Sequence, residues 1–135
     1  MKLLMKLLSV FIIPAILFSV FEARAESDAE KMAIVKAVDE AWGKLIVPLI
    51  LSYFAEDAKF IPMYSGQPVS KAQLKERWTK LLESCTRLDI QVRNMGVING
   101  AVFLERLDDF DVKGKHGKCP VVAVIEIKNV FKDSI

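Results

Sequence analysis

The first part of the chain after residue 26 carries apolar residues at helical spacing. Ser27 and Glu30 have the pattern of a capping box. Behind them, apolar side chains recur every three or four positions to about Lys44: Met32, Val35, Val38, Trp42 and Leu45. A proline is tolerated in a first helical turn, so Pro48 predicts a short second helix over residues 49–55.

A second capping box begins a third predicted helix. Ser70 and Gln73 form the box, and the apolar stripe behind it consists of Leu74, Trp78, Leu81 and Cys85. Between the second and third helices, residues 58–63 read as a short strand that ends at the turn residues Ser65, Gly66 and Pro68.

From Leu88 onward the apolar period changes from about 3.6 to 2, which is typical of strands. Two strands flank Asn99-Gly100, the dipeptide that best suits a tight hairpin turn. A third strand, over residues 120–128, is so rich in Val, Ala and Ile that we expect both of its faces to be covered. The order predicts an α+β domain, with helices on one face of a curved antiparallel sheet.

The hairpin pattern contains one conflict. A two-residue turn would place Arg93 opposite Arg106 and would turn the apolar face of Leu88, Ile90 and Val92 away from the core. We therefore predict a β-bulge near residues 94–96, which shifts the register by one residue.

Residues 1–25 have the order of a secretory signal peptide. Lys2 and Lys6 precede an apolar run, and Ala23-Arg24-Ala25 is a small-residue cleavage pattern. The run is about 15 residues long, whereas a bilayer span needs roughly 20, so a membrane anchor is the less favoured alternative. We expect cleavage after Ala25, an exported (periplasmic or secreted) product of residues 26–135, and no membrane association after cleavage.

The charge balance and the reactive residues exclude some classes of function. Three of the 19 Lys and Arg and one of the 17 Asp and Glu lie in residues 1–25, so the remainder is neutral, without the basic footprint of a nucleic-acid-binding protein. The spacing of Cys85 and Cys119 indicates no metal site. They are either a disulfide or two separate thiols. His116, the one histidine, reads as part of a solvated turn.

The strand after Asn99-Gly100 carries an arginine and a carboxylate on its apolar face. Alternation places five residues on that face: Val102, Leu104, Arg106, Asp108 and Phe110. The opposite face carries Glu105, Asp109 and Asp111 and is expected to be wetter. Buried ionisable pairs are enriched at functional sites, although Arg106 and Asp108 are also compatible with a structural ion pair or with a register in which both point outward.

Three segments resemble the limonene-1,2-epoxide hydrolases, which have the cone-shaped fold of nuclear transport factor 2 and ketosteroid isomerase. They are residues 53–58 (YFAEDA), 99–108 (NGAVFLERLD) and 120–127 (PVVAVIEI). The resemblance implies that Asp108 is the general acid on an epoxide oxygen and that Arg106 holds the catalytic aspartates. It implies direct attack by water with no cofactor or metal, and a homodimer formed through the exposed sheet face.

The chain departs from that family at three points. The second catalytic aspartate belongs to a final strand with the pattern W-R-D, which should begin near Ile135, so the sheet is expected to lack its last strand. Asp133, in the order Phe131-Lys132-Asp133, is a poor substitute because it follows Ile127 too closely. Phe60 and Pro62 occupy the positions of a tyrosine and an asparagine that hold the water.

Two functions follow from these observations. The first is hydrolysis of a small apolar epoxide to a diol, in a pocket lined by Val102, Leu104, Phe110 and the third helix. The second is a non-catalytic, exported module that binds a small apolar ligand in the same fold. With no final strand, the run over residues 121–127 would be an exposed sheet edge that favours self-association.

Overall fold

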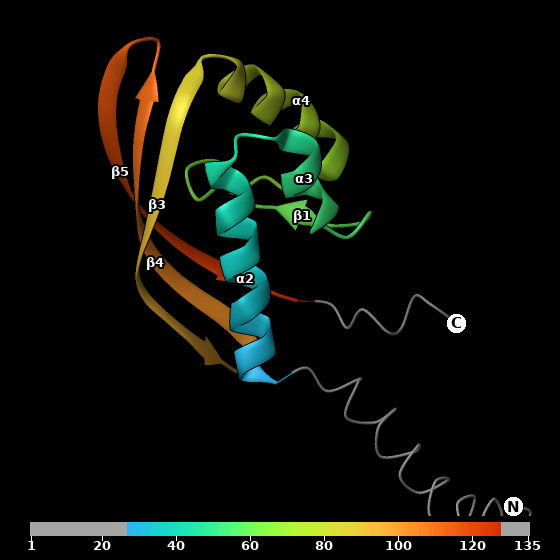
Figure 1. Ribbon diagram of the computed structural model, residues 1–135. Coiled ribbons are helices and arrows are strands. Elements are labelled where there is room, and N and C mark those ends of the chain that lie inside the picture. Colours follow the sequence, from blue (N-terminus) through green and yellow to red (C-terminus); the bar gives the residue numbers. More distant parts are fainter. Residues whose placement is uncertain (1–26, 128–135) are drawn as a thin grey trace, which may run out of the picture.

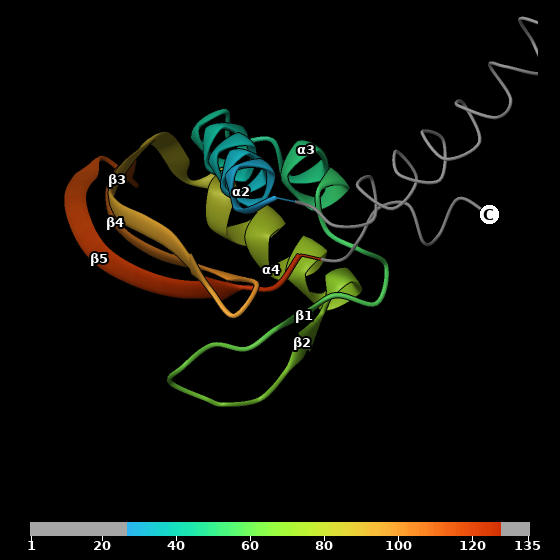
Figure 2. The same ribbon diagram turned by 90° about the horizontal axis from the view of Figure 1, so that it is seen from below.

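The computed structural model describes residues 27–127 and shows helices packed on one face of a curved antiparallel sheet (Figures 1 and 2). In chain order the elements are α2 (Asp28–Gly43), α3 (Val47–Ser52), β1 (Lys59–Phe60), β2 (Val69–Ser70), α4 (Lys71–Glu83), β3 (Cys85–Ile98), β4 (Ala101–Val112) and β5 (Lys115–Ile125). The large sheet has the order β3-β4-β5, and β1 pairs with β2 alone. The predicted α+β class is confirmed. The predicted signal peptide and residues 128–135, which include Asp133, lie outside the described residues.

Both capping boxes form as predicted. Ser27 accepts a hydrogen bond from the Glu30 amide and Glu30 accepts one from the Ser27 amide, and the Ser70–Gln73 pair does the same at the start of α4. The short helix α3 begins at Val47 rather than at residue 49, because Pro48 occupies its first turn. It also ends earlier than predicted, at Ser52.

The strands differ from the prediction where the sequence pattern is shortest or most polar. The strand predicted over residues 58–63 contains only two residues, and its partner β2 was not predicted, because two residues show no alternation.

The Asn99-Gly100 turn is confirmed, with φ of 50° and 80°. A second turn of the same kind lies at Lys113-Gly114, so β5 begins at Lys115 rather than at residue 120 and ends at Ile125. His116 is exposed to solvent as predicted, but the prediction that it lies in a turn is wrong, since this residue belongs to β5.

The predicted bulge is present one residue before the expected segment. Val92 lies opposite Arg106, whereas Asn94 lies opposite Glu105, which leaves Arg93 as the extra residue. This shift keeps the apolar residues on both sides of the bulge on the face that packs against the helices, and Val97 accordingly lies opposite Val102.

Only one face of β5 is covered within the described residues. Ala123 and Ile125 pack into the core, whereas Val122 and Val124 on the opposite face are 73% and 58% exposed. The prediction that both faces are covered is therefore wrong, because the helices of residues 27–127 all lie on the concave side of the sheet (Figure 2). The homodimer and the missing last strand stay predictions.

The core divides into two clusters. The first surrounds Trp78 of α4, whose ring makes T-shaped contacts with the rings of Trp42, Phe54 and Phe60 at centroid distances of 4.5, 5.5 and 5.9 Å. The second joins α2 to the sheet through Val35, Val102 and Leu104, each at most 2% exposed. The predicted pocket wall is thus wrong in two respects. Val102 and Leu104 are filled core, and α2 rather than α4 provides the helical side.

Candidate functional site

Arg106 and Asp108 point toward the helices from the concave face of β4, as the alternation predicted. Their side chains are each 16% exposed. Arg106 donates a hydrogen bond from Nη2 to Asp108 Oδ2 at 3.2 Å, and its Nε lies 2.9 Å from Oδ1. The bulge in β3 places Val92 beside this pair, since Val92 is the cross-strand neighbour of Arg106.

A second carboxylate reaches the same guanidinium from α2. Arg106 Nη1 donates a hydrogen bond of 2.5 Å to Asp39 Oδ1, and the Asp39 side chain is 8% exposed. Asp39 is not among the site residues predicted from the sequence. The available signal was its spacing, because Asp39 stands four residues after Val35 and three before Trp42, on the buried stripe of the helix.

Burial controls the electrostatics of this group. Removal from water raises the pKa of Asp39, and the charge of Asp108 raises it further, against the lowering effect of Arg106. Burial likewise raises the pKa of Asp108 above its ordinary value, again opposed by Arg106. One arginine therefore neutralises only one of two buried carboxylates, which favours the uptake of one proton by the pair.

Polar atoms of the group are left without aligned hydrogen bonds. Asp39 Oδ2 is fully buried and has no hydrogen-bond partner among the described residues. Arg106 Nε and Asp108 Oδ1 are near enough for ion pairing but are not aligned for a hydrogen bond. Buried polar atoms are rarely left unsatisfied, so the free oxygen of Asp39 marks a place for a water molecule, a proton or a ligand group.

Apolar residues and one thiol surround the charged group. Ile90 of β3 and Cys119 of β5 are the cross-strand neighbours of Asp108, and Val121 is that of Arg106. Further along β4 the ring of Phe110 lies over Gly117, where an added Cβ would stand only 2.7 Å from the ring.

The remaining candidates lie elsewhere. Phe60 packs on Trp78 in the other cluster, and Pro62 is buried in the loop after β1. Cys85 and Cys119 are free. Because β4 lies between their strands and their partners on β4 are four residues apart, they are offset by about 13 Å along the sheet. That offset excludes a disulfide, which requires Cα atoms within about 7 Å.

The convex face of the sheet carries a separate charge cluster. Arg87 of β3 binds Asp109 at 2.5 Å and Asp111 at 2.8 Å, and His116 lies 3.1 Å from Asp111. These contacts lower the pKa values of both carboxylates below the ordinary range. Asp109 is thus less exposed to solvent than predicted for this face, since only 9% of the residue is exposed.

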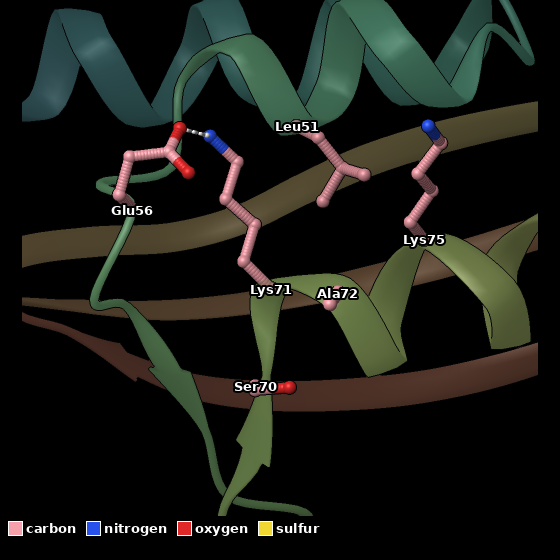
Figure 3. Close-up of a pocket in the computed structure, with 6 residues that line it drawn as sticks. All are labelled: Leu51, Glu56, Ser70, Lys71, Ala72 and Lys75. Carbon is pink, nitrogen blue, oxygen red and sulfur yellow. Dashed lines mark hydrogen bonds and ion pairs between the residues drawn. The ribbon is translucent and has the colours of Figure 1, made fainter.

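Two surface hollows among the described residues lie away from Arg106. One, of about 300 Å³, lies at the start of α4, where the side chain of Lys71 points toward Glu56 (Figure 3). The Nζ atom of Lys71 lies 2.7 Å from Oε1 of Glu56. The other, of about 360 Å³, follows the exposed side of α4. Within residues 27–127 no cluster of His, Cys, Asp and Glu has the arrangement of a metal site. The same residues contain no helix long and apolar enough to cross a membrane.

Comparison with solved structures supports the fold. An LEH-like epoxide hydrolase from M. tuberculosis superposes with a TM-score of 0.64 and 14% identity, over 75% of each chain. A ketosteroid isomerase-like protein from Catenulispora acidiphila in complex with trimethylamine gives 0.61 and 15%, over 70% of this chain and 75% of the other. AclR, a putative hydroxylase from Streptomyces galilaeus, gives 0.67 and 16%, over 75% and 72%.

No family model and no curated protein sequence matches the chain. At these identities the structural likeness establishes the ketosteroid isomerase-like cone fold, and it does not assign an activity.

Proposed function

We propose that this protein opens small apolar epoxides to diols by direct attack of water, with Asp108 as the general acid and Arg106 holding it in place. One observation carries the proposal, namely the two buried carboxylates with raised pKa values that share the guanidinium of Arg106. Ring opening places negative charge on the epoxide oxygen. A carboxyl group whose pKa is raised by burial holds its proton to higher pH, which suits a donor to that oxygen.

The surroundings of Asp108 favour an apolar substrate. Ile90 and Val92 of β3 flank the charged group on one side and Val121 of β5 flanks it on the other, and Val92 is 40% exposed. An epoxide with a hydrocarbon body would pack on these side chains while its oxygen approaches the carboxyl of Asp108.

The proposal is tested by comparing two adjacent aspartates. Asp108→Asn removes the proton donor and should lower diol formation from a small apolar epoxide by about 100-fold or more. Asp109→Asn is the matched control, because Asp109 is the next residue but faces the convex side with Arg87. Both rates are measured by quantifying the diol chromatographically.

Two results would contradict the proposal. If Asp108→Asn retains the wild-type rate, Asp108 is not the acid. If the wild-type protein binds apolar epoxides or diols without turnover, the protein is instead a non-catalytic ligand-binding module of the same fold.

A further inference from the structure

Direct attack by water requires a group that takes a proton from the water. The sequence resemblance places that base in a final strand that is expected to begin near residue 135, outside the described residues. Within the described residues, the carboxylate that shares Arg106 with Asp108 is Asp39. Its oxygen Oδ2 is buried and accepts no hydrogen bond from any described residue.

We propose that Asp39, supplied by helix α2, is the base that activates the attacking water. This inference rests on the proposed epoxide hydrolysis and adds a catalytic residue to the same site. Asp39 Oδ1 is fixed by Nη1 of Arg106, whereas Oδ2 is buried without a hydrogen-bond partner among the described residues and is the oxygen that a water molecule bound in the site would meet. A carboxylate oriented through one oxygen and free at the other is arranged for proton transfer.

The guanidinium separates the two carboxylates. Asp39 uses Nη1 of Arg106, whereas Asp108 uses Nε and Nη2, so the two carboxylates contact different nitrogens of the group. This separation matches the reaction, because water must approach an epoxide carbon from the side opposite the breaking carbon–oxygen bond. The base and the acid must therefore act from different directions.

Helix α2 holds Asp39 firmly in place. Val35, one turn earlier, is 1% exposed and packs on Val102 of the sheet, and Ala41, two residues later, is 2% exposed in the other cluster. The base is thus anchored to both parts of the core, and its position does not depend on a loop.

The proton balance of the step closes without any other reactant. The water oxygen forms a bond to the epoxide carbon while Asp39 takes a proton from the water. The bond from that carbon to the epoxide oxygen breaks, and the oxygen takes the proton of Asp108. The product is a diol, and transfer of one proton from Asp39 to Asp108 restores the starting state. Arg106 remains charged throughout and balances the single ionised carboxylate in both states.

The decisive experiment compares two nucleophiles on the same epoxide. Water needs a base, whereas azide is an anion at neutral pH and attacks without losing a proton. Asp39→Asn should therefore lower hydrolysis by about 100-fold or more while azide opening stays within a few-fold of the wild type. Asp108→Asn should lower both reactions, because both need the acid. Glu40→Gln, at the adjacent exposed position of α2, should change neither.

The ratio of hydrolysis to azide opening separates the possible results. An equal loss of both in folded Asp39→Asn would overturn the inference, because Asp39 would then serve only to orient Arg106. Unchanged hydrolysis would overturn it as well. If Asp39→Asn does not fold, Asp39→Glu keeps the charge opposite Arg106 but moves the base, so an unchanged ratio in that variant counts against the inference and a lowered one supports it. A wild-type protein that opens epoxides with neither nucleophile refutes the proposed function itself.

Discussion

Replacing Arg106 with methionine tests how much the stability of the fold depends on this cation, which lies between two buried carboxylates. Methionine keeps an unbranched stem but removes the charge that pairs with Asp39 and Asp108. Removing one partner of a buried ion pair costs about 3–5 kcal/mol, because a charge is left buried without compensation. The three side chains are at most 16% exposed, so solvent screens little of this cost. At a urea m-value of about 2 kcal/mol/M, a loss of about 3 kcal/mol lowers the midpoint by roughly 1.5 M.

The cost of Arg106→Met should depend on pH in a defined direction. Arg106 lowers the pKa values of Asp39 and Asp108 against the effect of burial, so in the variant both pKa values rise further. A carboxyl whose pKa is higher in the folded than in the unfolded state stabilises the fold at low pH, and that contribution is lost as pH rises through the folded pKa. The deficit relative to the wild type should therefore be largest at pH 8 and smaller at pH 5.

Arg87→Met is the matched control for this experiment. Arg87 also binds two aspartates, but on the convex face, and its side chain is 43% exposed. The urea midpoint should therefore fall less than in Arg106→Met, because solvent screens the exposed guanidinium of Arg87. Urea unfolding of both variants at pH 5 and pH 8 gives the comparison. The reasoning would be contradicted if Arg106→Met lost no more stability than Arg87→Met, or if its loss did not change with pH. Either result would show that Arg106 does not stabilise the buried charges.

Two further predictions concern the neighbours of the site. Gly117→Ala places a Cβ 2.7 Å from the ring of Phe110 and should lower the free energy of unfolding by about 1–3 kcal/mol. Gly96→Ala is the control and should have little effect, because an added Cβ there has no atom within 4 Å. Equal urea midpoints for the two variants would contradict the close packing of Phe110 on Gly117. Alkylation of the unfolded protein without reductant should add two groups, one each at Cys85 and Cys119, and an unchanged mass in the monomer would mean that these thiols are joined.

The features that the sequence predicted well are those with a local physical cause. The Ser27 and Ser70 caps depend on residues three positions apart, and the Asn99-Gly100 turn depends on the conformational preference of two adjacent residues. The bulge at Arg93 was predictable because a regular register would have buried charge and exposed apolar side chains.

The missed features depend on contacts between distant segments. Asp39 and Arg106 are 67 positions apart, and helical spacing alone does not show which strand residue faces a helix carboxylate. The same limit explains why the predicted pocket lining was wrong. Leu104 was correctly placed on the inner face of the sheet, but it packs against Val35 of α2 and therefore lines no open space. The two-residue strand at Phe60 is defined by its pairing with Val69, and two residues are too few to show an alternating apolar pattern in the sequence.

The bulge at Arg93 determines how this chain must be aligned with its relatives. Before the bulge the inward positions of β3 are even-numbered, as at Ile90 and Val92, and after it they are odd-numbered, as at Met95 and Val97. A relative whose strand lacks the extra residue will match both halves only if a one-residue gap is placed at position 93. A gap placed at the hairpin turn instead would pair every residue between 94 and 98 with one from the opposite face of the sheet.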